Sequence, residues 1–143
     1  MKALPKYLLA AGLLLAALVP AHAQRITGSD YSTVGYIQSD GTVQDAGYRT
    51  IGHIKRDGTV QDAGFRTVGH IRSDGTLQDG SYCTIGHIKS DGTVQDAGFR
   101  TIGHIKDDGT IQDGSYRTVG HAPGIKKEWA ALYLFPQVIP FRR

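Results

Sequence analysis

Residues 50–66 read TIGHIKRDGTVQDAGFR, and close variants of this stretch occupy residues 33–49, 67–83, 84–100 and 101–117 without a gap. A fixed sequence period is the signature of a repeat architecture. One unit of this length is too short to bury an apolar face by itself, so neighbouring units must pack on one another. The sequence therefore predicts one repeat domain in which five units present the same side chains to their surroundings.

Each unit is predicted to form an antiparallel β-hairpin around its Asp-Gly pair, which is Asp57-Gly58 in the second unit. A two-residue loop would set Ile54 opposite Gln61, apolar against polar. A three-residue loop sets Ile54 opposite Val60 instead, apolar against apolar. We therefore expect the three-residue loop, with its glycine in the left-handed conformation.

A second turn is expected after each hairpin, at Asp62-Ala63-Gly64 in the second unit and at the matching residues of the other units. Both connections are far too short for a parallel crossover, so the strands must run antiparallel. Residues 26–32 resemble residues 111–117, and residues 118–121 begin another unit, so the two end segments can pair and close a ring without free edges. The expected fold class is all-β: a closed rosette, or toroid, of antiparallel β-hairpins with a C-terminal apolar segment. Five and six hairpins both remain open.

The first residues have the order of a secretory signal peptide. Lys2 and Lys6 precede an apolar run, which is followed by the small-residue triplet Ala21-His22-Ala23. The apolar run is shorter than the roughly 20 residues that a transmembrane helix needs. We expect residues 1–23 to be cleaved, and the protein to be exported to the periplasm or the extracellular space without a transmembrane span.

The expected domain organisation assigns residues 24–121 to the repeat domain and residues 122–143 to a closing segment or plug. Residues 129–135 are the most apolar stretch after the signal peptide, and Trp129 is the only tryptophan. An exposed apolar patch of this size is unusual on a soluble monomer. A plug over one open end of the rosette is therefore favoured over a patch for a membrane or a partner.

Charge gives no sign of nucleic-acid binding. Of the 16 basic residues, 14 remain after loss of Lys2 and Lys6, against 13 acidic residues, which leaves a net charge of +1. Basic residues alternate with aspartates, so there is no basic stripe for phosphate groups. Cys83 is the only cysteine and replaces the arginine of other units, so an intermolecular disulfide and a neutral surface change both remain open.

The repeated G-H-I-x-x-D-G-T-V-Q-D core, the export signal and the K-K-E-W-A-A segment at residues 126–131 together resemble the small exported bacterial proteins called 5-fold beta-flower proteins. The resemblance covers nearly all of the chain after residue 23. It implies a compact rosette of β-hairpins, and it implies no activity, cofactor or catalytic residue.

One histidine recurs in every unit except the first, which has Tyr36 at that position. Imidazoles around a closed ring could bind a metal or sense pH. However, zinc ligands must converge to about 2.1 Å from one point, and equivalent residues of a toroid stand further apart. We therefore expect no metal and no cofactor, and keep the histidines as low-ranking candidates for binding: His53, His70, His87, His104 and His121.

Two other repeated features are predicted to be structural. The aspartates have no calcium-loop spacing, so they are expected to form turns. The aromatic position accepts tyrosine and phenylalanine equally, which favours packing in the common core with the isoleucines and valines. The aromatic residues are Tyr48, Phe65, Tyr82, Phe99 and Tyr116.

These features predict a protein that is not an enzyme, because an array of near-identical hairpins does not bring different groups to one reacting atom. The leading hypothesis is an exported structural or ligand-binding module, and a glycan or another component of the cell envelope is the first ligand class to consider. The alternative is a metal- or pH-responsive protein that acts through the repeated histidines.

Overall fold

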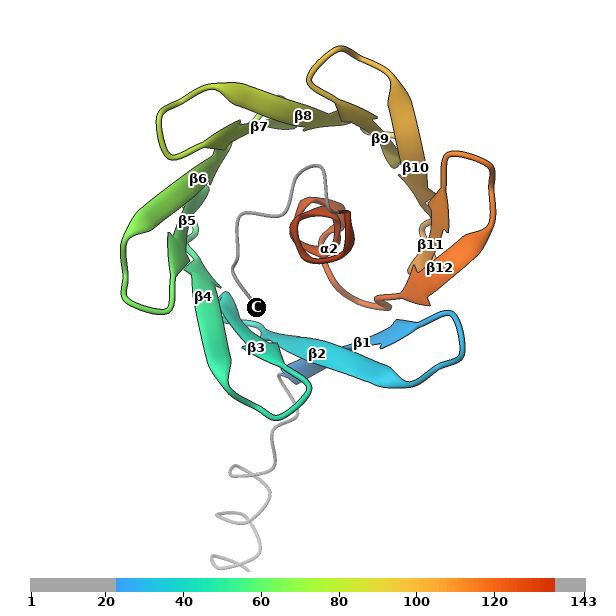
Figure 1. Cartoon of the computed structure of the whole chain (residues 1–143), viewed down its shortest axis with the longest axis horizontal. Coiled ribbons are helices and arrows are strands. Elements are labelled where there is room, and N and C mark those ends of the chain that lie inside the picture. The colour runs from blue at the N-terminus through green and yellow to red at the C-terminus, as the bar shows by residue number, and fades with distance from the viewer. Residues whose placement is uncertain (1–22, 136–143) are drawn as a thin grey trace, which may run out of the picture.

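The computed structural model of the protein describes residues 23–135, which form a closed ring of antiparallel strands around one helix (Figure 1). Each strand pairs with the strands before and after it in the sequence, and β1 pairs with β12. The strands are β1 (Ala23–Gly28), β2 (Thr33–Gln38), β3 (Thr42–Asp45), β4 (Thr50–Ile54), β5 (Thr59–Asp62), β6 (Thr67–Ile71), β7 (Thr76–Asp79), β8 (Thr84–Ile88), β9 (Thr93–Asp96), β10 (Thr101–Ile105), β11 (Thr110–Asp113) and β12 (Thr118–His121).

The predicted all-β fold class is confirmed, and the structure selects six hairpins. Twelve strands close the ring, and the sixth unit is built from the two end segments: Thr27 pairs with His121 and Gly28 with Gly120. The pairing of β1 with β12 leaves no open sheet edge, as the sequence predicts.

The register at the Asp-Gly turns is also as predicted. Ile54 lies opposite Val60, and the loop of residues 56–58 is closed by two hydrogen bonds, from Lys55 N to Thr59 O (2.8 Å) and from Gly58 N to Lys55 O (3.0 Å). Gly58 has a φ of +92°, which favours glycine. Its carbonyl then accepts a hydrogen bond from Ile71 N of the next unit (2.7 Å), so each turn also joins neighbouring units.

The second turns lie at the outer rim of the ring, where they connect β1 to β2, β3 to β4 and so on (Figure 1). The prediction placed this turn one residue too early. Asp62 belongs to β5 and donates its backbone N–H to Arg66 O (2.9 Å), so the loop consists of residues 63–65. Phe65 therefore occupies the loop position that has a positive φ, at +67°.

The core lies inside the ring. The strands contribute buried isoleucine, valine and leucine side chains, as predicted, although Ile71 is only partly buried. The C-terminal apolar segment forms helix α2 (Lys127–Leu134), which runs through the centre of the ring (Figure 1). Its buried residues Ala130, Ala131, Leu132 and Tyr133 complete the core.

Two predictions concern residues beyond the described part of the chain. The expected signal peptide, residues 1–23, lies outside it except for Ala23, the first residue of β1, and the C-terminal residues 136–143 also lie outside it. Within residues 23–135, no helix has the length and apolar character needed to cross a membrane.

Candidate functional site

The aromatic residues of the second turns lie on the surface, so their predicted place in the core is wrong. Their exposed fractions are 62 to 68 per cent, and the set includes Tyr31 from the N-terminal end segment. The cause is the shifted turn: the aromatic residue is the last loop residue and falls outside the in-and-out alternation of the strands. The six residues are Tyr31, Tyr48, Phe65, Tyr82, Phe99 and Tyr116.

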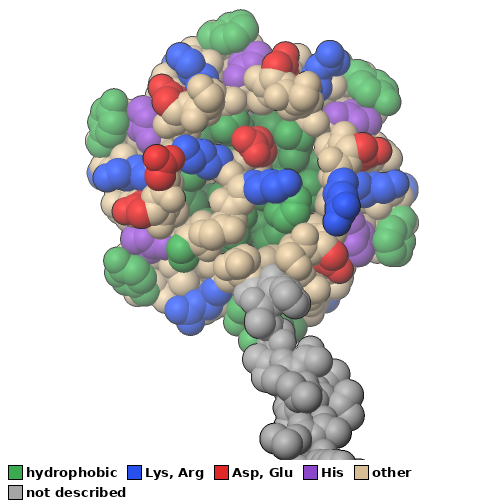
Figure 2. Space-filling model, turned by 180° about the vertical axis from the view of Figure 1, so that it is seen from behind, with side chains coloured by type: hydrophobic (Ala, Val, Ile, Leu, Met, Phe, Trp, Pro, Cys, Tyr) green, Lys and Arg blue, Asp and Glu red, His purple; other side chains and the backbone are tan. Residues whose placement is uncertain are grey.

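Each exposed ring stacks on the residue that occupies the repeated histidine position. Phe65 lies flat on His53 of β4, with ring centroids 4.4 Å apart and planes inclined by 10°. The other five pairs have centroid separations of 4.1 to 4.5 Å and inclinations of 7 to 12°. The pair of Tyr31 and His121 joins the two ends of the chain. We call these six pairs the rim stacks, and Figure 2 shows histidines beside hydrophobic side chains at the edge of the ring.

The structure therefore places the candidate histidines apart from one another, one to a rim stack. Tyr36 takes the same role opposite Tyr48. Among the described residues, no three His, Cys, Asp or Glu side chains lie together in a way that could hold a metal ion. The imidazoles have an aromatic ring as their neighbour, which makes them stacking partners.

In five of the six rim stacks, an aspartate three residues before the aromatic residue fixes the turn, whereas Gly28 takes this position before Tyr31. Asp62 Oδ1 accepts hydrogen bonds from the backbone N–H groups of Gly64 and Arg66, both at 2.9 Å, and Oδ2 accepts one from Arg66 Nε at 3.1 Å. The hydrogen bond from the Arg66 backbone is the largest influence that lowers the pKa of Asp62 below its ordinary value. Each ring is thus carried by a turn with its own hydrogen bonds, which limits the movement of the ring.

Cys83 replaces the turn arginine of the other units and is an exposed free thiol. Its backbone N–H still donates to Asp79 Oδ1 at 3.0 Å, so the turn keeps its shape without the arginine side chain. The thiol is therefore not needed for the turn.

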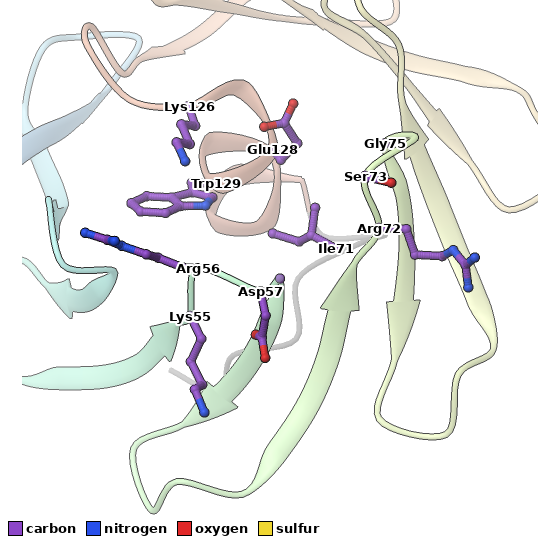
Figure 3. Close-up of a pocket in the computed structure, with 11 residues that line it drawn as sticks. Lys55, Arg56, Asp57, Ile71, Arg72, Ser73, Gly75, Lys126, Glu128 and Trp129 are labelled. Atoms are coloured by element: carbon purple, nitrogen blue, oxygen red, sulfur yellow. The ribbon is translucent and has the colours of Figure 1, made fainter.

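A second surface feature lies where the Asp-Gly turns approach the start of α2. Two clefts of about 320 and 470 Å³ share three lining residues, Arg56, Lys126 and Trp129. Figure 3 shows Trp129 projecting from the helix between Lys126 and Arg56. We call these three residues the central triad. The sequence predicts Trp129 as part of the plug, but only a structure can bring it next to Arg56, which lies 73 residues earlier.

Comparison with known proteins identifies the family. The sequence model of a family described as 5-fold beta-flower protein matches residues 23–136, which is most of the chain. The chain belongs to this family, as its repeats predict. Comparison with curated proteins and with solved structures found no match.

Proposed function

We propose that this beta-flower protein is an exported, non-catalytic protein that binds glycans through its six rim stacks. The observation that carries the proposal is the exposure of six equivalent aromatic side chains, each stacked on a partner side chain at the edge of one closed ring of strands. A pyranose presents a face of C–H groups, and such a face packs well on an exposed aromatic ring. Rigid aromatic side chains also provide contact area at a low cost in conformational entropy.

The backbone conformation of the aromatic residues indicates that they do more than stabilise the turn. All six aromatic residues have φ between +66° and +68°, a region that costs a residue with a side chain roughly 1–2 kcal/mol and costs glycine nothing comparable. Stacking on the partner ring stabilises the fold by about 0.5–1.5 kcal/mol. Because these terms are similar, stability alone gives little reason to keep an aromatic residue at all six positions. Ligand contact would supply that reason.

Equivalent sites suit a polymer. A glycan chain that contacts one rim stack has the others nearby at a high effective concentration, so weak single contacts add up to useful avidity. The same repetition argues against catalysis, since every rim stack offers the same few groups and an enzyme needs different groups at one reacting atom. The signal-peptide pattern of residues 1–23 supports the proposed export to the periplasm or the extracellular space.

The alternative, a metal- or pH-responsive protein, has less support. Each histidine faces an aromatic ring, and the described residues contain no cluster of metal-ligating side chains. We therefore propose that the histidines support the exposed rings and contribute to the rim sites through them.

The proposal is tested by screening the purified protein on a glycan array and in pull-downs with insoluble cell-wall polysaccharides. The informative variant is Phe65→Gly with Phe99→Gly, because glycine removes two rings and accepts the same backbone conformation. We expect binding to a polymeric glycan to fall by more than the one third of sites removed, since avidity depends on several contacts. The matched control, Phe65→Tyr with Phe99→Tyr, keeps both rings and should bind like the parent. Full binding by the glycine variant, or no glycan retained by the parent, would refute the proposal.

A further inference from the structure

We infer that the central triad of Arg56, Lys126 and Trp129 forms a separate binding site for a carboxylated sugar. This site lies where the Asp-Gly turns approach the start of α2, whereas the rim stacks lie at the outer turns. It does not depend on the proposed rim sites, because the two share no residue. The argument rests on space, on a break in the repeat symmetry and on charge.

The clefts next to Trp129 have the size of a ligand site. Their volumes of about 320 and 470 Å³ fall within the roughly 300–1,000 Å³ that is usual for small-molecule pockets. Trp129 is partly buried against the core and lines both clefts. One side of the site is thus a flat apolar surface on which a sugar ring can pack.

The repeats show that Arg56 is exceptional. Three other units have a serine at this position, and the fifth has Asp107, which pairs with Lys127 Nζ of α2 at 2.6 Å. Asp107 therefore has a structural explanation. Arg56 has none of this kind: within residues 23–135 it makes no hydrogen bond or ion pair, and it lines both clefts. An arginine that replaces a serine and has no partner among the described residues is available to a ligand.

The charge around Trp129 favours an anion. Of the charged residues that line the smaller cleft, Arg56 and Lys126 lie beside Trp129 and Glu128 lies on the same helix, whereas the side chains of Lys55, Arg72 and Asp57 point away from Trp129 (Figure 3). Asp57 already accepts a hydrogen bond from Thr59 N at 2.9 Å in its own turn. The planar guanidinium of Arg56 can bind both oxygens of a carboxylate at once.

The remaining lining residues identify the ligand as a sugar. The larger cleft contains the polar side chains of Gln24, Gln38 and Ser39, which can donate to and accept from hydroxyl groups. The Asp40 carboxylate also lines this cleft and already accepts a hydrogen bond from Thr42 N at 2.9 Å in its own turn. Lys126 Nζ lies 5.1 Å from the centre of the Trp129 ring, where it adds a second positive charge close to the stacking surface. A ring, a carboxylate and several hydroxyl groups together describe a uronic acid unit.

Trp129 allows a direct test, because the only tryptophan of the chain reports on this site by its fluorescence. We would titrate the purified protein with oligogalacturonate, with the neutral oligosaccharide of the same length, and with galactose 6-phosphate. We expect a saturable change in emission with oligogalacturonate and at least tenfold weaker binding of the other two. Equal binding of the neutral or the phosphorylated sugar, or no saturable response to oligogalacturonate, would overturn the inference.

Two variants separate a specific site from general charge attraction. Arg56→Ser installs the residue of three other units, so the fold tolerates it, and we expect about tenfold or greater loss of affinity from removal of a charged hydrogen-bonding group. Arg56→Ser with Ser90→Arg restores the net charge at a position outside both clefts and should bind as weakly as Arg56→Ser. Parent-like affinity in either variant would contradict the site. The rim variant with Phe65→Gly and Phe99→Gly should keep the fluorescence response, so failure of the rim proposal and failure of this one are distinguishable.

Discussion

Replacement of Gly35 by alanine is the sharpest test of how the helix fills the ring. Gly35 lies in β2 and faces Tyr133 of α2, whose side chain is completely buried. The Tyr133 hydroxyl shares its hydrogen between Val34 O at 2.8 Å and Gln44 O at 3.0 Å. A Cβ atom at Gly35 would overlap this hydroxyl and would lie 2.5 Å from Gln44 O.

The expected cost follows from what can move. The carbonyl of Gln44 belongs to a paired strand and Tyr133 is enclosed by the core, so neither can yield easily. Overpacking of this kind costs about 1–3 kcal/mol, and an immobile neighbourhood places it at the upper end. If Tyr133 shifts away, its hydrogen bond to buried carbonyls is lost as well, at about 1 kcal/mol or more. We expect Gly35→Ala to lower the free energy of unfolding by about 4 kcal/mol, a large part of the roughly 5–15 kcal/mol of a typical domain.

The measurement is urea unfolding followed by circular dichroism and by Trp129 fluorescence. Gly47→Ala is the matched control, because a Cβ atom there would meet only Asp45 Oδ1, at 3.5 Å, and Gly47 has no positive φ. It should change the free energy of unfolding by no more than about 0.5 kcal/mol. If the two variants are equally stable, Tyr133 does not pack on Gly35, and the central place of α2 is wrong.

Three further predictions concern the turns. Phe65→Gly should change the free energy of unfolding, measured with urea, by no more than about 1 kcal/mol, because relief of the positive φ offsets loss of the stack with His53. A larger loss would show that the stack is mainly structural. Hydrogen bonds, in most cases from a backbone N–H, lower the pKa of the turn aspartates such as Asp57 and Asp62 below 3.8 in the folded protein. As the pH falls, the unfolded chain therefore takes up protons before the folded protein does. The contribution of these aspartates to stability is fully present above about pH 5 and should fall as the pH drops through 3.8 and below. An unchanged melting temperature between about pH 5 and pH 2.5 would contradict this prediction. Cys83→Arg should form the exposed ion pair seen at Arg66 and Asp62, yet raise the free energy of unfolding by less than about 1 kcal/mol, and a larger gain in urea unfolding would show that these pairs matter more than expected.

The fold was predictable because its determinants are local and repeated. Setting Ile54 opposite Val60 is enough to choose the three-residue loop, and the same choice recurs in every unit. Closure was predictable because residues 26–32 and 118–121 each look like part of a unit. The number of hairpins was not, since it depends on whether those two segments pair, as Thr27 and His121 do.

The candidate site was less predictable, because the second turn of each unit lies one residue later in the sequence than the pattern predicts. The rule that favours a loop of residues 56–58 also fits a loop of residues 63–65, but that loop puts Phe65 where glycine is usual. Aromatic residues rarely adopt a positive φ, so the sequence alone favours placing Phe65 in a strand and in the core. The signal that was available is the recurrence of tyrosine or phenylalanine three residues after a turn-forming aspartate.

The central site could not be predicted from the sequence. A single helix packs against six similar units, so it presents different side chains to different units. Each unit offers the same glycine of its first strand, yet Gly35 receives Tyr133, Gly103 receives Phe135 and Gly120 receives Leu134. The Asp-Gly turns near the start of α2 also have different helix residues as neighbours. One of these turns carries Asp107, which pairs with Lys127 of the helix. A residue that departs from the repeat can be explained by contact with the helix or by a ligand, or it can be a neutral surface change, as remains open for Cys83. Contact with the helix accounts for Asp107, whereas Arg56 has no partner among the described residues and lines both clefts, which is why we propose a ligand for it.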